Sequence, residues 1–170
     1  FFDAVGPYVD VVYMSDDVCT QQGPMMSPDV YRRLIKPRHE TLIQFVKERC
    51  NAKILFHSCG SIVNLLDDLI DIGIDAINPV QVASRGMADT AELKRRFGTR
   101  VAFWGAIDSQ WVLPFGSPDD VQREVVRRIQ DLSVNGGYVL AAVHNIQHDV
   151  PPANIVAMFQ SARQHGTSAS

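Results

Sequence analysis

The stretch Lys53–Val63, KILFHSCGSIV, joins an apolar run to a histidine, a cysteine and a glycine. A short apolar run that ends at a glycine-containing turn is typical of a buried β-strand. We therefore predict a strand over Lys53–Phe56 and a helix from Ser61, as its cap, to Ile72, where Gly73 ends it. The stretch predicts one β-α unit with chemically reactive side chains in its turn.

The same strand-helix pattern recurs along the chain. Further strands are predicted at Val9–Met14, Asp75–Val80, Val101–Ile107 and Tyr138–Val143. Further helices are predicted from Ser27 to about Cys50 with a kink or division at Pro37, over Asp89–Phe97, from Ser117 to about Val134, and from Pro151 or Pro152 to about Gln164. The segment Ser15–Met26 is predicted to be a loop.

Strands that alternate with helices form parallel sheets with right-handed crossovers. The predicted fold class is therefore α/β, with about five β-α units and parallel strands. Two architectures fit, an open doubly wound sheet and a (β/α)8 TIM barrel. A complete barrel takes about 250 residues, so a chain of 170 residues would form only a partial barrel.

The composition narrows the classes of function. A net charge of −3 with scattered basic residues does not predict the basic surface of a nucleic-acid-binding protein. A content of 46% hydrophobic residues suffices for the core of one soluble domain. The apolar runs are shorter than the roughly 20 residues of a membrane span. Three cysteines are too few for a disulfide framework. We expect one domain over residues 1–165 and a polar tail over 166–170. The few cysteines and the lack of a visible signal peptide favour a cytoplasmic location. Because the sequence has no starting Met, we expect it to be a piece of a longer protein.

Polar side chains follow every predicted strand. In both α/β architectures, functional residues gather at the carboxyl ends of the strands, which lie on one face of the molecule. The residues that follow the strands are Asp16, Asp17, His57, Ser58, Cys59, Asn78, Gln81, Asp108, Gln110, His144, Asn145, Gln147, His148 and Asp149. We therefore expect the functional site on this face.

His57 and Cys59 are the candidates for metal binding. On an extended backbone they alternate with Ser58, so both side chains can point to the same side. Imidazole and thiolate are ligands that zinc prefers, and His144 at another strand end offers a third ligand. The alternative is that Cys59 is a small packing residue and His57 a hydrogen-bonded core histidine.

The remaining candidates have two interpretations each. Asp16 and Asp17 are expected to serve a metal or a cationic substrate, or to be solvated loop residues; Asp108 is expected to orient a substrate or to cap the next segment. The other cysteines, Cys19 and Cys50, are predicted to be packing residues. The histidines His39, in mid-helix, and His148, in a loop, are predicted to be exposed.

Five segments together resemble the C-terminal half of the uroporphyrinogen decarboxylase superfamily. They are SDDVCTQQGPMMSPDVYRRLIKPRHETLI, ILFHSCGSI, LIDIGIDAINPVQ, LKRRFGTRVAFWGAID and NGGYVLAAVHNIQHDVPPANI. The resemblance implies a (β/α)8 barrel of which this chain supplies about the last five strands. The N-terminal strands would lie outside it, so we expect the chain to self-associate through its exposed barrel edges.

The superfamily has two branches with different chemistry. Its methyltransferases move a methyl group between a corrinoid and a thiol, with zinc bound by a His-x-Cys pair and a distant cysteine. His57 and Cys59 match the pair, whereas the place of the distant cysteine, counted back from VPPANI, falls on His144. A histidine also lies near that place in the decarboxylases, which remove carboxyl groups from uroporphyrinogen without a metal.

The resemblance favours zinc-dependent methyl transfer from a methylated corrinoid, on a partner protein, to a small-molecule thiol. Zinc would be bound by His57, Cys59 and His144, with Asp16 or Asp17 in its fourth position at rest. The other assignments are Asp16, Asp17 and Asp108 as catalytic residues, and Asn78, Gln81 and Asn145 as substrate-binding residues.

Two alternatives remain open. The first is uroporphyrinogen decarboxylation in porphyrin biosynthesis. Its substrate carries many carboxylates, but few basic residues follow the predicted strands, and Arg85 is the main local candidate for binding them. The family's essential Asp and its Arg-rich loop belong to the N-terminal half and have no counterpart in this sequence. The second alternative is that the chain alone is inactive because it needs a missing half.

Overall fold

The computed structural model describes residues 1–166. Its strands are β1 (Val11–Ser15), β2 (Cys19–Thr20), β3 (Gly23–Pro24), β4 (Lys53–His57), β5 (Ala76–Val80), β6 (Ala102–Ile107) and β7 (Tyr138–Ala142). Its α-helices are α1 (Phe2–Val5), α2 (Pro28–Val30), α3 (Lys36–Lys47), α4 (Leu66–Asp71), α5 (Thr90–Phe97), α6 (Val112–Phe115), α7 (Pro118–Leu132) and α8 (Pro152–His165). Short 3-10 turns at Gly6–Tyr8 and Ile62–Asn64 and a π-helical turn at Tyr31–Ile35 complete the elements.

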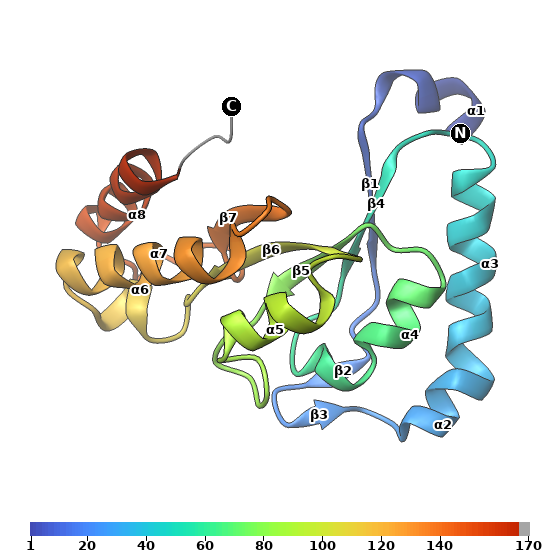
Figure 1. Cartoon of the computed structure of the whole chain (residues 1–170), viewed down its shortest axis with the longest axis horizontal. Helices are drawn as coiled ribbons and strands as arrows, with labels where there is room; N and C mark the ends of the chain where they lie inside the picture. Colours follow the sequence, from blue (N-terminus) through green and yellow to red (C-terminus); the bar gives the residue numbers. More distant parts are fainter. Residues whose placement is uncertain (167–170) are drawn as a thin grey trace.

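Five strands form one parallel sheet in the order β1-β4-β5-β6-β7 (Figure 1). The order follows the sequence without a reversal, whereas a doubly wound sheet reverses where its two halves meet. Right-handed crossovers between strands in this order all place their helices on the same face. The predicted fold class, α/β with parallel strands and about five β-α units, is confirmed, and the strand order favours an arc of a barrel over an open doubly wound sheet.

The core fills the space between this sheet and its covering helices. The strand residues Ile54, Phe56, Ile77 and Phe103 are fully buried and belong to one apolar cluster with residues of α3, α4 and α5. A second cluster lies under α6, α7 and α8 and includes Ile107. Because side chains alternate along a strand, the residues between these core positions face the opposite side of the sheet.

Most predicted element boundaries lie within two residues of the observed ones, because local signals set them. Ser27 accepts a hydrogen bond from the backbone N–H of Val30 at 3.3 Å. Asp89 accepts one from the N–H of Glu92 at 2.9 Å, and Ser117 forms a capping box with Asp120. These side chains satisfy backbone donors that a helix start leaves free.

The predicted division of the long helix from Ser27 near Pro37 is confirmed, because the π-helical turn Tyr31–Ile35 ends there and Pro37 lies in the first turn of α3. Two other local predictions were wrong. The loop Ser15–Met26 contains the antiparallel strands β2 and β3. Ser61 does not cap α4, because its hydroxyl instead donates to the backbone oxygen of Arg85 at 2.6 Å.

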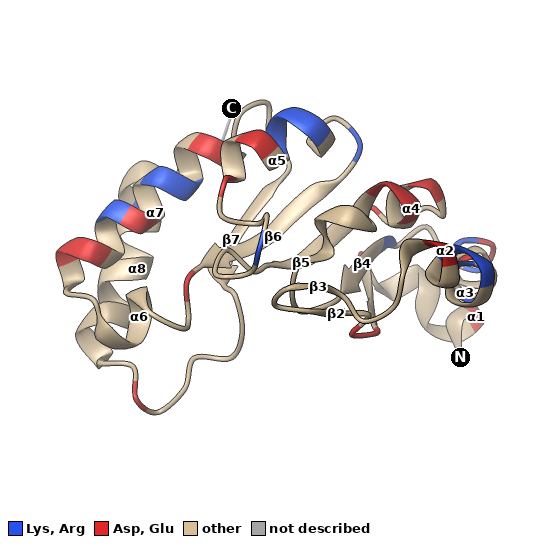
Figure 2. Ribbon diagram, turned by 90° about the horizontal axis from the view of Figure 1, so that it is seen from below, with Lys and Arg blue, Asp and Glu red and all other residues tan. Residues whose placement is uncertain are grey.

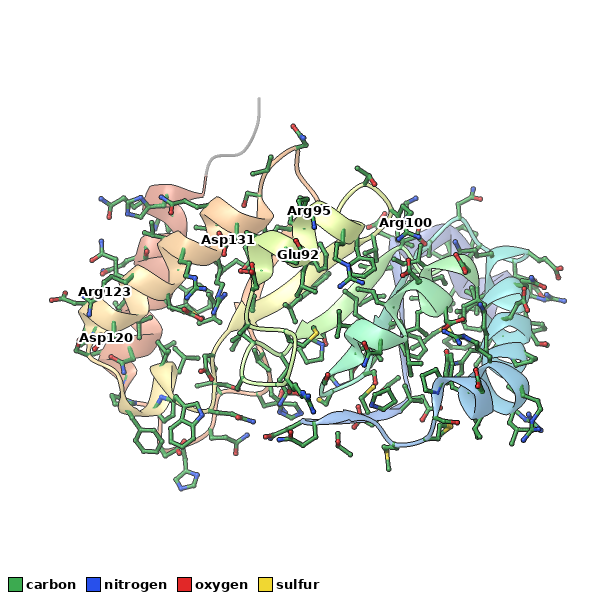
Figure 3. All side chains as sticks on the ribbon, turned by 60° about the horizontal axis from the view of Figure 1, so that its bottom comes forward. Glu92, Arg95, Arg100, Asp120, Arg123 and Asp131 are labelled. Atoms are coloured by element: carbon green, nitrogen blue, oxygen red, sulfur yellow. The ribbon has the colours of Figure 1, made fainter. Side chains whose placement is uncertain are left out.

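Charged residues lie mainly on the covering helices (Figure 2). The pairs Glu92–Arg95 and Asp120–Arg123 lie on the outer surfaces of α5 and α7 (Figure 3). Within residues 1–166, no helix has the length and apolar character needed to cross a membrane. Of the predicted polar tail, residues 167–170 lie outside the described part of the chain, and the predicted domain boundary at residue 165 stays a prediction.

The self-association of the chain also stays a prediction, and the structure identifies the two strand edges through which it would occur. Within the described residues, β1 pairs only with β4 and β7 only with β6, so each has one free edge. Apolar side chains on both edge strands are exposed, with 56% for Tyr13 and 40% for Val139. Because free edges with apolar side chains pair with other strands, the isolated 170-residue chain is expected to form dimers or larger species in light scattering. A monodisperse monomer at high concentration would contradict this.

Candidate functional site

The ends of β1 and β4 bring three potential metal ligands together. Asp17 Oδ1 accepts a hydrogen bond from the backbone N–H of Cys59 at 2.7 Å. Cys59 Sγ lies 3.4 Å from His57 Nε2. One ligand atom from each of Asp17, His57 and Cys59 lies within 4.8 Å of the others. The group therefore combines a carboxylate oxygen, an imidazole nitrogen and a sulfur at one strand end.

The orientation of His57 is fixed by Asn78 on the neighbouring strand. His57 Nδ1 lies 2.6 Å from Asn78 Oδ1. An amide oxygen only accepts hydrogen bonds, so Nδ1 carries the hydrogen and Nε2 keeps its lone pair. That lone pair is on the side of Cys59 Sγ. A hydrogen bond of this kind to the second ring nitrogen is the usual support of a metal-binding histidine.

The turn after Cys59 depends on Gly60. Its φ of +100° is one that residues with a side chain rarely adopt. A Cβ at this position would lie only 2.5 Å from the backbone oxygen of Thr20 in β2. The N–H of Gly60 donates to Gln81 Oε1 at 2.6 Å. Gly60 thus lets the chain turn sharply against β2, which holds Cys59 at the strand end.

The local environment of Cys59 favours its neutral form. Burial, and secondly the negative charge of Asp17, raise the pKa of the Cys59 thiol above its ordinary value. A bound divalent cation would reverse both effects, because it neutralises the carboxylate and deprotonates a coordinating thiol. The nitrogen, sulfur and carboxylate donors fit the ligand set of zinc. The residues present therefore fit zinc, and three protein ligands would leave a tetrahedral position open.

His144 does not join this group within the described residues. It is exposed in the turn after β7, and its ring centre lies 6.4 Å from that of His57. The structure thus brings Asp17, rather than His144, next to the His57–Cys59 pair. His57 and His144 line the same pocket, and the predicted role of His144 as a ligand stays a prediction.

The pocket lies on the side of the sheet away from the covering helices. It has a volume of about 450 Å³ and is lined by Tyr13, Leu55, His57, Asn78, Trp104, Ala141, Ala142, Val143, His144 and Asn145. Tyr13 lies beside His57, with ring centres 5.5 Å apart. The lining side chains carry no carboxylate, ammonium or guanidinium group. This wall therefore suits an uncharged or weakly polar part of a substrate.

The other predicted site residues have separate places. Asp108 accepts hydrogen bonds from the backbone N–H groups of Gln110 and Trp111 at 2.7 and 3.2 Å, which makes it a cap of the loop after β6. Gln81 is buried and holds Gly60 rather than facing the pocket. Asn78 and Asn145 line the pocket. Their assignments as catalytic or substrate-binding residues stay predictions.

Asp16 and Asp17 point in different directions although they are adjacent. Asp17 faces Cys59, whereas Asp16 Oδ2 lies 3.0 Å from His39 Nε2 in α3. The prediction that His39 is exposed was wrong, because only 8% of it is accessible. The helical pattern gave no signal for this contact, since it depends on how α3 packs against β1.

Two aromatic residues of the pocket were also missed by the sequence analysis. Tyr13 and Trp104 lie within predicted strands, where apolar residues are expected on both faces. The alternation of β1 could have identified Tyr13, since it is two residues from Ser15 on the same side of the strand. By contrast, Cys19 is buried and Cys50 packs against the core, as predicted.

Comparisons with known proteins find relatives of two kinds. The family model for uroporphyrinogen decarboxylase (URO-D) matches residues 4–165. The methylcobamide:CoM methyltransferase of Methanosarcina barkeri is 28% identical over 157 residues, which are 92% of this chain and 42% of that protein. The uroporphyrinogen decarboxylase of Synechococcus sp. (strain JA-3-3Ab) is 27% identical over 139 residues, or 82% of this chain and 36% of that protein.

A solved structure shows the same fold. The methyltransferase from Methanosarcina mazei superposes with a TM-score of 0.72 at 24% identity, over 96% of this chain and 44% of that one. The predicted fold, a partial (β/α)8 barrel, is therefore confirmed. The chain spans less than half the length of the relatives it matches.

Proposed function

The chain belongs to the uroporphyrinogen decarboxylase family, and from this premise we propose that its parent protein transfers a methyl group to a thiol at a zinc ion. Zinc would be held by His57, Cys59 and Asp17, with His144 available across the pocket. The observation that carries the proposal is the cluster of these three ligand atoms within 4.8 Å of one another. A metal-free decarboxylation could use the imidazole and the carboxylate for proton transfer, but it would not require a sulfur ligand beside them.

Each residue has a defined task in this proposal. Bound zinc would supply a positive charge that lowers the pKa of a substrate thiol and keeps it as a thiolate at neutral pH. Asn78 fixes the tautomer of His57, so that Nε2 is free to bind the ion. Gly60 and Gln81 hold the turn that presents Cys59. The pocket wall, which carries no carboxylate, ammonium or guanidinium group, would contact an uncharged part of the reactants.

The likeness to a methylcobamide:CoM methyltransferase suggests the reactants. We propose a methylated corrinoid as the donor, carried by a partner protein, and a small-molecule thiol as the acceptor. The thiol would lose its proton, and its sulfur would then form a bond to the methyl carbon. The bond between that carbon and cobalt would break, and its electron pair would stay on the corrinoid.

Decarboxylation is the second candidate, because a uroporphyrinogen decarboxylase is similar to the chain at nearly the same identity. A porphyrinogen that carries many carboxylates calls for arginine side chains around it. The described pocket wall offers none, and Arg85 lies in the loop after β5 without lining the pocket. This contrast supports methyl transfer over decarboxylation.

The proposal predicts a specific pattern of turnover by the full-length protein. With methylcobalamin and a panel of small thiols, we expect thiol-dependent loss of the methylcobalamin absorbance, because the thiolate accepts the methyl group. Treatment with a chelator is expected to stop the reaction, and added zinc to restore it. The same preparation is expected to leave uroporphyrinogen unchanged in a porphyrin assay by chromatography.

Each other outcome has a clear meaning. Turnover of uroporphyrinogen that is unaffected by the chelator would replace methyl transfer with decarboxylation. Activity in neither assay would contradict both candidates. Activity in the full-length protein but not in the isolated 170-residue chain would support the alternative that the chain needs a missing half.

A further inference from the structure

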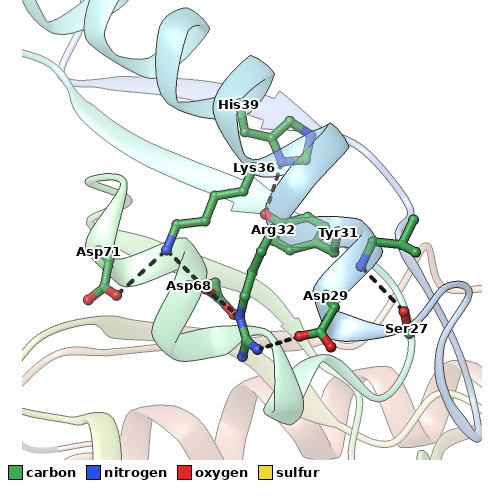
Figure 4. A network of polar contacts seen from close by, with 9 residues as sticks. Ser27, Asp29, Tyr31, Arg32, Lys36, His39, Asp68 and Asp71 are labelled. Atoms are coloured by element: carbon green, nitrogen blue, oxygen red, sulfur yellow. Dashed lines mark hydrogen bonds and ion pairs between the residues drawn. The ribbon is translucent and has the colours of Figure 1, made fainter.

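Three residues outside the pocket form a line of polar contacts that ends at the site. The Tyr31 hydroxyl lies 3.2 Å from His39 Nδ1, and His39 Nε2 lies 3.0 Å from Asp16 Oδ2. Figure 4 shows the first of these contacts beside a separate ion-pair cluster around Asp68. Tyr31 is fully buried and His39 is 8% accessible. None of these contacts is needed by the proposed chemistry of the pocket.

The π-helical turn at Tyr31–Ile35 helps to align this line. In an uninterrupted α-helix, residues eight apart lie roughly 80° apart around the axis. The backbone N–H of Lys36 instead reaches back five residues to the oxygen of Tyr31, so each residue of this turn rotates less. Tyr31 is thereby turned towards the side on which His39 lies. Such turns are frequent at functional sites.

His39 also contacts the strand that carries the site. Its ring packs edge-on against Phe56, with ring centres 5.1 Å apart. Phe56 directly precedes His57 in β4. His39 therefore contacts Phe56 in β4 and Asp16 directly after β1, and the ends of these two strands supply all three clustered ligands.

The contact between Asp16 and His39 also affects the orientation of Asp17, the next residue in the chain. Its backbone N–H donates to the oxygen of His57 at 3.0 Å, while its carboxylate meets His39. Consecutive side chains of an extended segment point to opposite sides. Because Asp16 points towards His39 in α3, Asp17 points to the opposite side of the segment. There its carboxylate accepts a hydrogen bond from the backbone N–H of Cys59.

We propose that Tyr31 and His39 are positioning residues of the site, which act through Asp16 to hold the Asp17 carboxylate against Cys59. As a claim about zinc the proposal rests on the proposed function, whereas the link from His39 to Cys59 stands on the geometry alone. A residue that supports a metal ligand typically changes metal affinity by 10- to 100-fold when it is replaced.

The test follows the Cys59 amide in the metal-free, full-length protein. Labelling with 15N-cysteine limits the spectrum to cysteine amides, and Cys59→Ser identifies the signal of Cys59. Asp17→Ala provides the reference for a Cys59 amide without its acceptor. His39→Leu is expected to move the signal towards this reference and to speed the hydrogen exchange of the amide about tenfold. Tyr31→Phe is expected to move it less, in the same direction.

A matched control separates positioning from general loosening of the helix. Asp68 accepts from Arg32 at 3.0 Å and from Lys36 at 2.9 Å, and so ties the same helical segment to α4 without touching Asp16 (Figure 4). Asp68→Asn is expected to leave the Cys59 amide unchanged. If His39→Leu fails to fold, Asp16→Ala at the exposed strand end breaks the same link and is expected to give the same shift.

The outcomes distinguish the two proposals. A Cys59 amide that stays unchanged in His39→Leu and Asp16→Ala, or that moves equally in Asp68→Asn, would overturn the positioning role. If the wild-type protein binds no zinc, while the Cys59 amide signal still shifts in His39→Leu, the zinc proposal is overturned and the positioning role is kept. With both correct, His39→Leu also weakens zinc binding about tenfold in a titration.

Discussion

Replacement of Cys59 by serine is expected to remove zinc from the full-length protein and to lower methyl transfer about a thousandfold. Wild-type protein purified without a chelator should contain about one zinc per chain. The change removes the only sulfur among the clustered ligands Asp17, His57 and Cys59. A hydroxyl remains protonated at neutral pH and is a weak zinc ligand, so the site loses about 4 kcal/mol of binding free energy.

The loss of activity follows from the loss of the metal. An ordinary thiol has a pKa of about 8.5 and is mostly protonated at pH 7. Without the positive charge at the strand end, the acceptor would be neither ionised nor positioned next to the methyl donor. Metal content by mass spectrometry and the methylcobalamin assay measure the two effects.

Cys50→Ser is the matched control for this change. Cys50 packs partly buried after α3, and its thiol donates to the backbone oxygen of Val46 rather than facing the strand ends. It is expected to keep both zinc and activity. Zinc at the wild-type level in Cys59→Ser would make Cys59 a packing residue and would contradict the proposed site.

Replacement of Gly60 by alanine is expected to destabilise the protein by about 3 kcal/mol. Two costs add at this position. The φ of +100° is unfavourable for alanine, and its Cβ would lie 2.5 Å from the oxygen and 2.8 Å from the carbonyl carbon of Thr20. The backbone of β2 would have to move, because a carbonyl group cannot rotate away as a flexible side chain can. Denaturant unfolding measures the change.

Gly136→Ala separates these two costs. Gly136 has a φ of +78°, and within the described residues no heavy atom would lie within 4 Å of a Cβ added there, so only the backbone cost remains. We expect a loss of about 1 kcal/mol at this position. Equal destabilisation by the two variants would show that the contact with Thr20 contributes nothing. Gly60→Ala is also expected to weaken zinc binding, whereas Gly136→Ala is not.

Local signals explain why the fold was predictable. Each strand of the five-stranded sheet is a short, mainly apolar run, and the helix starts at Ser27, Asp89 and Ser117 carry side chains that cap backbone donors. These interactions connect residues three apart in the chain, so the sequence pattern contains them. The strand order favoured a barrel over the doubly wound alternative, which the pattern of elements by itself had left open.

The site was predictable in part. That His57 and Cys59 share a strand end follows from their spacing, and the structure places their ligand atoms 3.4 Å apart. The choice between Asp16 and Asp17 was not predictable, because it depends on the contact of Asp16 with His39, 23 residues away. The His-x-Cys pattern likewise contained no information about Asn78, which fixes the tautomer of His57 from another strand.

The sequence by itself therefore determined the alternation of strands and helices, the family and the His57–Cys59 pair. The alternation and the pair rest on periodicity, on capping and on spacing within single elements, whereas the family rests on the resemblance of five sequence segments. Only the tertiary structure decided that Asp17 joins the pair, that His144 lines the same pocket as His57 and that His39 is buried beside Asp16 and Phe56. The physical reason is that such contacts join different strands and helices, whose relative positions are set by the packing of the whole core.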